Sequence, residues 1–258
     1  MLFRLLAARA RTLDLRGRVV VITGGSRGLG LALARRFGAE GAKLAICARN
    51  RAELQAAHAD LSARGIDVLA ARCDVGSEDQ VRHFLQSAVA HFGGIDVLVN
   101  DASIILAAPV DALAREDFAR VMDSNFWGTL HASYAALEHL RPGGRIVNIT
   151  SIGGAVAVPH LLPYTAAKFA AEGFSEGLHA ELAARGIRVV SVLPGLMRTG
   201  SFLNAFVKGN RAAEFRWFAL SSTLPLLTIN AERAAARIVK ACRRGEAIVV
   251  VGVPAKML

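Results

Sequence analysis

The sequence predicts a doubly wound α/β fold, in which a parallel sheet of about seven strands is covered by helices on both faces. Three observations predict it. Short β-branched runs alternate with longer helical patterns from residue 18 onward, the runs are apolar along nearly their whole length, and a glycine-rich turn follows the first of them. Strands separated by helices pair in parallel, and a strand that is apolar on both sides must be covered on both faces.

Each strand is expected where Val, Ile and Leu cluster, because such side chains fit an extended chain that is packed on both sides. The expected strands are RVVVITG (18–24), KLAICA (43–48), DVLAARC (67–73), IDVLVND (95–101), GRIVNITS (144–151), IRVVSVLPG (187–195) and a last strand at 246–251. Helices are expected between them at 29–41, 51–65, 77–93, 115–139, 163–185 and 230–244. The helix at 77–93 has a clear start signal, a Ser77 cap followed by Glu78 and Asp79 in its first turn.

The chain is long enough for one such domain. It has 258 residues, of which 53% are hydrophobic, and it contains no low-complexity tract. We expect an N-terminal arm over residues 1–16 and a single domain over residues 17–258. Residues 196–228 interrupt the alternation and carry five large aromatic side chains: Phe202, Phe206, Phe215, Trp217 and Phe218. Since parallel sheets bind ligands at the carboxyl ends of their strands, we expect this insertion to form a substrate lid.

Composition argues against several other classes of protein. No window reaches the roughly 18 apolar residues that a membrane-spanning helix needs. The three cysteines, Cys47, Cys73 and Cys242, lack metal-ligand spacing and are expected as core residues of a protein in the reducing cytoplasm. The net charge of +10 comes mostly from arginines scattered through helical segments, which favours an anionic cofactor or surface over nucleic acid. No histidines stand at metal-ligand spacing, so no metal is expected.

The N-terminal arm has two interpretations. Residues 1–18 contain five arginines and a single acid, Asp14, and the apolar part is too short for a secretory signal. Several apolar residues could share one side of a short helix: Leu2, Phe3, Leu6, Ala10 and Leu13. The arm therefore either packs on the domain or on a sister subunit, or it makes a weak peripheral contact with an anionic membrane surface.

The strongest local motif is VVVITGGSRGLGLALA, residues 19–34, where Gly24, Gly28 and Gly30 lie between a strand and a helix. Glycine permits a tight turn and a close approach to a pyrophosphate, and the free N–H groups at the start of the helix face the anion. Tight turns between strands and helices use glycine in any case, but here strand, turn and helix are all in place. The motif therefore indicates a nucleotide-binding loop.

The spacing G-x-x-x-G-x-G resembles that of the classical short-chain dehydrogenase/reductase family, whose Thr-Gly-x-x-x-Gly-x-Gly loop is matched from Thr23 to Gly30. The resemblance extends over roughly residues 16–254. It implies a Rossmann-like fold and hydride transfer to or from a nicotinamide cofactor. It also implies a cofactor-binding set: Gly24, Ser26, Arg27, Gly28, Leu29, Gly30, Arg49, Asp74, Val75, Asn100, Ala102, Tyr164, Lys168, Pro194, Gly195 and Thr199. In the family, Asp74 would meet the adenine and Pro194 and Gly195 would lie over the nicotinamide.

The choice between NAD and NADP depends on the residues after the second strand. An acid there would hold the ribose 2′-hydroxyl of NAD, but the sequence reads CARNR, with Ala48 at that position and Arg49 next. Arg27 lies within the glycine loop, and two guanidinium groups suit a 2′-phosphate. The alternative is that both arginines are solvated surface residues. We expect NADP(H) to be preferred over NAD(H).

The segment VNDAS departs from the family, which usually has Asn-Asn-Ala-Gly after the fourth strand. Asn100 and Ala102 match, while Asp101 and Ser103 replace the second Asn and the Gly. A carboxylate in this segment would lie near the cofactor cavity and could disturb cofactor affinity or the geometry of the loop.

The expected catalytic set is Asn125, Ser151, Tyr164 and Lys168. Tyr164 and Lys168 adjoin on one helix, so the ammonium can lower the pKa of the phenol from about 10. The resemblance implies that Tyr164 transfers the proton and that Lys168 also binds the nicotinamide ribose. It further implies that Ser151 holds the substrate oxygen and that Asn125 organises a water chain to Lys168. Alone, each residue has an ordinary explanation, such as a solvated helix pair, a turn cap or a strand end.

The predicted function is an NADP(H)-dependent oxidoreductase, a carbonyl reductase acting on a hydrophobic ketone or aldehyde or the corresponding secondary alcohol. One alternative is a 3-oxoacyl-thioester reductase, in which Lys208, Arg211 and Arg216 of the lid would meet an acidic carrier or a CoA phosphate. A second is a cofactor-binding sensor or scaffold without turnover. The resemblance also implies a homodimer or homotetramer.

Overall fold

The computed structural model of the chain describes residues 12–200, 204–210, 214 and 228–252. Within this range, a seven-stranded sheet with the order β11–β7–β6–β4–β1–β2–β3 forms the centre of the molecule. Its strands are β1 (Val19–Thr23), β2 (Lys43–Ala48), β3 (Val68–Arg72), β4 (Ile95–Asn100), β6 (Leu140–Ile149), β7 (Arg188–Pro194) and β11 (Ile248–Val251). All of these pairings are parallel, which confirms the predicted doubly wound sheet.

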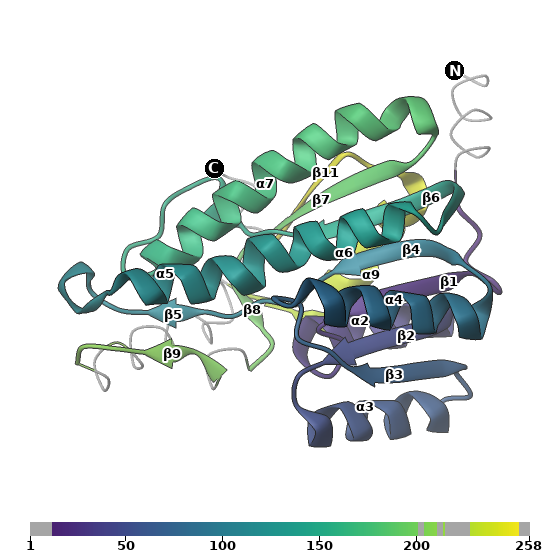
Figure 1. The fold of residues 1–258 in the computed structure, drawn as a ribbon, viewed down its shortest axis with the longest axis horizontal. Coiled ribbons are helices and arrows are strands. Elements are labelled where there is room, and N and C mark those ends of the chain that lie inside the picture. Colours follow the sequence, from purple (N-terminus) through teal and green to yellow (C-terminus); the bar gives the residue numbers. More distant parts are fainter. Residues whose placement is uncertain (1–11, 201–203, 211–213, 215–227, 253–258) are drawn as a thin grey trace.

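Helices cover both faces of this sheet (Figure 1). One layer consists of α2 (Gly28–Ala39), α3 (Arg51–Ala63) and α9 (Ala231–Arg244). The other consists of α4 (Glu78–Phe92), α5 (Arg115–Met122), α6 (Gly128–Leu137) and α7 (Leu162–Leu182). Val20 and Ile22 of β1 pack toward the first layer and Val21 toward the second. Because both faces are covered, every residue of β1 is buried, as its apolar sequence indicated.

The order of the strands reverses beside β1. From β1 the chain proceeds outward to β2 and β3, and then returns to the other side of β1 and proceeds through β4, β6 and β7 to β11. At such a switch point, the loops that follow neighbouring strands separate and leave a crevice at the carboxyl edge of the sheet. The fold therefore places a cleft where the glycine loop begins.

One predicted helix differs from the observed structure. The segment expected as a single helix at 115–139 consists of α5, a wider π-helical turn over Asp123–Trp127, and α6. In this turn the Gly128 N–H bonds to the Asp123 carbonyl, five residues back. The side chain of Asn125 within it bonds to the backbone of Ile104 at both its amide atoms. Hydrophobic periodicity cannot reveal such a turn, because the apolar stripe continues across it.

Two small parallel pairs lie beyond the main sheet. β5 (Leu106–Ala107) pairs with β9 (Phe206–Val207), and β8 (Met197–Arg198) pairs with β10 (Ile229–Asn230). Strands of two residues carry no periodic signal, so the sequence did not predict them. Of the five lid aromatics, only Phe206 is described; Phe202, Phe215, Trp217 and Phe218 lie outside the described residues.

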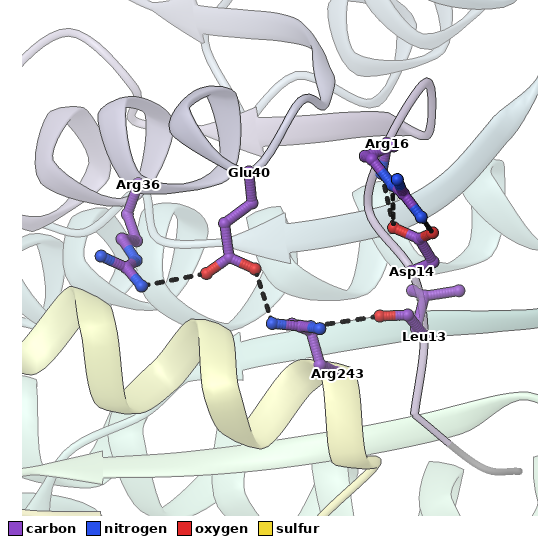
Figure 2. Close-up of polar contacts among 6 residues, drawn as sticks. All are labelled: Leu13, Asp14, Arg16, Arg36, Glu40 and Arg243. Atoms are coloured by element: carbon purple, nitrogen blue, oxygen red, sulfur yellow. Dashed lines mark hydrogen bonds and ion pairs between the residues drawn. The ribbon is translucent and has the colours of Figure 1, made fainter. Parts of the chain in front are cut away.

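Residues 12–16 pack at the opposite edge of the sheet from the cleft. Leu15 is 1% exposed, and the backbone of Leu13 exchanges hydrogen bonds with Arg243 of α9. Figure 2 shows that Arg243 also bonds to Glu40, at 2.8 Å, and that Arg36 bonds to the other carboxylate oxygen of Glu40. These contacts join the start of the described chain to α2 and α9. The rest of the predicted arm, residues 1–11, lies outside the described residues.

Candidate functional site

A cavity of about 440 Å³ lies at the carboxyl edge of the sheet, where the loops after β1, β2, β4, β6 and β7 meet. Predicted cofactor-binding residues line it from the glycine loop to the loop after β7: Gly24, Ser26, Arg27, Gly28, Leu29, Arg49, Val75, Ala102, Tyr164, Lys168, Pro194 and Thr199. Four others do not line it. They are Gly30, Asp74, Asn100 and Gly195.

The glycine loop is built so that no side chain could replace its key glycines. Gly24 and Gly28 have φ values of 74° and 57°, the left-handed region that favours glycine. A Cβ on Gly24 would lie 2.8 Å from the Cα of Ala102, and a Cβ on Gly30 would lie 2.3 Å from the carbonyl oxygen of Gly24. The loop therefore packs directly against the segment after β4 and leaves the first N–H groups of α2 at the cavity, a geometry that fits a dinucleotide diphosphate.

Charged groups of both signs lie at the β2 end of the cavity. Arg27 is 3.3 Å from Glu53, and Arg49 is 4.0 Å from Asp74, with all four side chains between about one third and one half exposed. The Ser26 hydroxyl also donates to Glu53, at 3.4 Å. Both arginines were predicted from the sequence, but Glu53 was not. Glu53 lies on α3, five residues beyond Ala48, the position where an acid that binds NAD was expected.

Three of the predicted catalytic residues meet at the end of β6. Ser151 follows β6 and is 9% exposed, and its side chain accepts the N–H of Gly153 at 3.0 Å. Tyr164 in the first turn of α7 hydrogen-bonds to Ser151. Lys168, one turn later and 3% exposed, has its Nζ 5.7 Å from the centre of the Tyr164 ring. Tyr164 and Lys168 both line the cavity.

The pKa of the phenol differs from the sequence expectation. Burial raises the pKa of Tyr164 above 10, the negative charge of Asp101 raises it further, and the hydrogen bond with Ser151 opposes both. Lys168 donates to the carbonyl of Ile149 at 2.9 Å, and burial lowers its own pKa to about 8. The pKa of the phenol is therefore raised, whereas the sequence led us to expect a lowered one, because burial is the largest effect on it.

Asn125 lies behind the cavity wall. It is 1% exposed, accepts the Ile104 N–H at 2.8 Å and donates to the Ile104 carbonyl at 3.0 Å. Both ends of its amide are therefore bonded to the segment that leads from β4 to β5. Asn100 is likewise a buried structural residue, since it donates to Ser133 and to Asn148 of β6.

Asp101, which departs from the family pattern, is a carboxylate that lines the cavity. It follows β4, and its backbone N–H donates to the hydroxyl of Thr23 at 3.2 Å. The carboxylate accepts the N–H of Gly30 at the start of α2, and the positive charge of Lys168 on α7 stabilises its ionised form. Burial raises the pKa of Asp101 to about 7, and the Gly30 bond and Lys168 oppose this rise.

Six further lining residues are outside the predicted cofactor-binding and catalytic sets. They are Ile104, Ile105, Ile149, Met197, Asn204 and Phe206, and because five of them are apolar they form an apolar wall; Met197, Asn204 and Phe206 belong to the predicted lid. Lys208 beyond β9 binds the buried Asp117 at 2.6 Å, and the guanidinium of Arg120 stacks 3.6 Å from the ring centre of Phe206. These contacts attach the described part of the lid to α5.

Two further features of the described residues concern metal binding and membranes. No group of three or more His, Cys, Asp or Glu side chains there could hold a metal ion. No helix there combines the length and the apolar character needed to cross a lipid bilayer. The three cysteines are buried and unpaired by disulfides, and Cys73 lines the cavity.

Comparison with protein families and curated proteins gives consistent matches. The model of the short chain dehydrogenase family matches residues 18–207. The SadH protein of Mycobacterium tuberculosis, named as an oxidoreductase, is 36% identical over 244 residues, which cover 93% of this chain and 88% of that protein. The 3beta-hydroxysteroid dehydrogenase 1 of Eggerthella lenta is 36% identical over 192 residues, covering 72% of this chain and 73% of that enzyme.

Solved structures share the fold. A short chain dehydrogenase from Burkholderia cenocepacia, in complex with NADP, is 31% identical with a TM-score of 0.80, covering 93% of this chain and 98% of that one. A short chain dehydrogenase/reductase from Burkholderia phymatum, in complex with NAD, is 23% identical with a TM-score of 0.86, covering 92% and 90%. The second likeness concerns the fold alone.

Proposed function

Because this chain belongs to the short-chain dehydrogenase/reductase family, and is therefore a nicotinamide-dependent oxidoreductase, we propose that it uses NADP(H) to reduce hydrophobic ketones or aldehydes. The observation that carries the proposal is that Tyr164 and Lys168 line a cavity that also has an apolar wall, and that Tyr164 hydrogen-bonds to Ser151. The residues and the cavity fit the cofactor, as the glycine loop and the N-terminus of α2 indicate.

The bound cofactor would supply the hydride, and the side chains would manage the substrate and the proton. Ser151 holds the carbonyl oxygen of the substrate by a hydrogen bond. Tyr164 donates its phenolic proton to that oxygen as the negative charge develops, and takes a proton back in the reverse reaction. Lys168 binds the cofactor ribose and, through its ammonium, helps to return a proton to Tyr164. Asn125 supports this wall through Ile104.

The preference for NADP(H) is supported by Arg27 and Arg49, which line the β2 end of the cavity and are about half exposed. A 2′-phosphate would draw both guanidinium groups away from Glu53 and Asp74. Glu53 also offers an alternative, since a carboxylate near the ribose suits the 2′-hydroxyl of NAD. Dissociation constants for NADPH and NADH should separate the two cases. With NADP(H) preferred, Arg49→Ala should weaken NADPH binding about tenfold and leave NADH binding little changed.

The hydrophobic substrate is supported by the apolar wall, to which Ile105, Met197 and Phe206 contribute. One similar curated enzyme is named for a hydroxysteroid, which is a secondary alcohol on an apolar ring system. Charged substrates would have to give up their hydration against this wall without a partner. A cyclic or long-chain ketone is therefore the substrate class we propose.

The alternative, a 3-oxoacyl-thioester reductase, depends on basic residues of the lid. Of these, Lys208 is bound to the buried Asp117, so its charge is already balanced. Arg211 and Arg216 lie outside the described residues. Lys208 therefore does not favour this alternative, although the apolar wall would accept an acyl chain.

The test is oxidation of NADPH with a panel of cyclic ketones, long-chain aldehydes and 3-oxoacyl thioesters. We expect turnover with apolar ketones, and Tyr164→Phe should lower kcat by about 100- to 10,000-fold while NADPH still binds. A variant that keeps its full rate would refute the role of Tyr164 as proton donor. Binding of NADPH with no turnover on any substrate would instead favour the sensor or scaffold.

We also propose a homo-oligomer that forms through an aromatic face on the π-helical turn, α6 and α7. Trp127, Tyr134 and Phe169 are 43%, 59% and 45% exposed. Trp127 contacts the ring of Phe126, and both Phe126 and Tyr134 contact Phe174. Large exposed aromatic groups in contact with one another are typical of protein interfaces. Sedimentation of the wild type and of Tyr134→Glu tests this: an equal mass for both, whether monomeric or oligomeric, would count against the proposed face.

A further inference from the structure

Three ionisable side chains share the reaction end of the cavity. Asp101 comes from the loop after β4, while Tyr164 and Lys168 come from α7, and all three line the same space. The carboxylate of Asp101 accepts the N–H of Gly30. The two residues are in close contact, since a Cβ placed on Gly30 would lie 2.7 Å from Oδ2 of Asp101. The backbone of Asp101 is held in addition by the hydroxyl of Thr23.

The other charged groups around this cluster are few among the described residues. Glu172, one turn beyond Lys168 on α7, also faces the ammonium, but its carboxylate accepts the Ser191 hydroxyl at 2.7 Å. Ser151 from the loop after β6 bonds to the phenol. Arg27, Arg49 and Glu53 line the same cavity from α2, β2 and α3. Asp101 is therefore the carboxylate that acts on both Tyr164 and Lys168.

The signs of the charges determine what Asp101 does. A lone ammonium beside a phenol would favour loss of the phenolic proton, because it attracts the phenolate. An ionised carboxylate in the same space opposes this attraction, because its charge has the opposite sign to that of the ammonium. The carboxylate also repels a phenolate directly and makes the ammonium harder to deprotonate. All three effects keep protons on Tyr164 and Lys168.

We propose that Asp101 is a positioning residue for the proton: its carboxylate keeps the Tyr164 phenol and the Lys168 ammonium protonated, and so sets the highest pH at which the site can reduce a carbonyl. This inference rests on the reductase function proposed above. Burial has the largest effect on the pKa of Tyr164, and the charge of Asp101 adds to it in the same direction.

The direct test uses the fact that the chain has only two tyrosines. Tyr134 is exposed on α6, so the variant Tyr134→Phe leaves Tyr164 as the sole source of tyrosinate absorbance at alkaline pH. In this background, Asp101→Asn should lower the midpoint of the tyrosinate titration by about one pH unit. Asparagine keeps an oxygen that accepts the N–H of Gly30, so the substitution removes the charge with little change of shape.

The matched control is Glu53→Gln in the same background. Glu53 lines the cavity at the β2 end, and the pKa of Tyr164 has no contribution from it, so the tyrosinate midpoint should not move. Circular dichroism at each pH reports whether the chain is still folded. An unchanged or raised midpoint in a folded Asp101→Asn variant would overturn the proposal, as would an equal shift in the control.

A second measurement covers the case in which the chain unfolds before Tyr164 titrates. The alkaline limb of the pH profile of kcat/KM for ketone reduction should move to lower pH by about the same amount in Asp101→Asn. The rising limb of alcohol oxidation should move with it, because that reaction needs the phenolate. A change of rate by one factor at every pH would indicate a merely structural effect and would overturn the proposal. The titration needs no cofactor or substrate, so its result stands even if the reductase assay fails.

Discussion

The carboxyl group of Asp101 binds its proton near pH 7 in the folded chain, because burial raises its pKa from the usual value of 3.8. Between these two pH values, the folded state holds more protons than the unfolded state, so stability falls as the pH rises from about 4 to about 7. The slope from this group is at most about 1.4 kcal/mol per pH unit.

Asp101→Asn should remove this part of the pH dependence. Urea unfolding of the cofactor-free protein at pH 5 and pH 7.5 measures it: the wild type should lose more stability between the two than the variant does. At pH 7.5 the substitution removes the cost of burying a charged carboxylate, but it also removes the attraction of that carboxylate to Lys168. Because these two effects on stability oppose each other, the change of stability with pH is more informative than the stability at either pH alone. Equal slopes would show that Asp101 titrates in the folded state as it does in an unfolded chain.

Gly30 in α2 and Gly177 in α7 have different surroundings, and substitution by alanine should have opposite effects at the two positions. In α2, a Cβ on Gly30 would lie 2.3 Å from the Gly24 carbonyl oxygen, so Gly30→Ala should displace the loop and weaken cofactor binding at least tenfold. In α7, Gly177 is exposed and a Cβ there would meet nothing within 4 Å. Gly177→Ala should stabilise the protein by about 0.5–1 kcal/mol through helix propensity.

Urea unfolding and cofactor titration of the two variants check this pair. Gly177→Ala serves as the control for Gly30→Ala, since the two changes are chemically identical and both are made in a helix. Normal cofactor affinity in Gly30→Ala would mean that the loop can move away from its neighbour, contrary to the close packing described above.

At the scale of the whole molecule, Arg243 joins three segments that are far apart in sequence. It bonds to Glu40 at the end of α2, to the carbonyl of Leu13 and, through its own backbone, to the Leu13 N–H. Its side chain is 38% exposed, so solvent screens the ion pair. Arg243→Met should therefore lower the free energy of unfolding by about 1 kcal/mol.

Arg36 provides the comparison for Arg243, because it contacts the same carboxylate, Glu40, but stays within α2. Arg36→Met should change the free energy of unfolding by about 0.5 kcal/mol or less. High salt should reduce the effect of both substitutions. If the two variants were equally stable, the contact with Leu13 would add nothing measurable to the fold.

The fold could be predicted from the sequence because its strands are apolar on both sides and its helices carry clear signals, such as the Ser77 cap, whose hydroxyl accepts the Gln80 N–H. The glycine loop could be predicted for a related reason, since strand, turn and helix all leave local patterns. Glu53 was missed as a cavity residue because nothing local marks it, and its place depends on how α3 packs against other elements. Phe206 was expected in the lid, but its pairing with Leu106 was not predicted, because a two-residue strand has no period to detect.

The pKa of Tyr164 could not be predicted from spacing alone, although the spacing correctly placed Lys168 one turn away. The sequence shows that an ammonium is near, but not how deeply the phenol is buried or that a third charge shares the space. Asp101 was noticed as a departure from the family pattern, yet its position beside Gly30 became visible only when the loop after β4 was seen against α2.

The pairing of β5 with β9 has a consequence for how the protein is made. Leu106 and Phe206 are separated by about a hundred residues of chain, so this wall of the cavity cannot form on the ribosome until the sixth strand of the main sheet and the segment after it have emerged. The β1–β2 and β2–β3 pairs, by contrast, join strands that are close in sequence and can begin to form earlier. The part of the apolar wall that Phe206 forms thus assembles after those pairs. Held to β5 by only two paired residues, it should also be among the first to exchange its amide hydrogens.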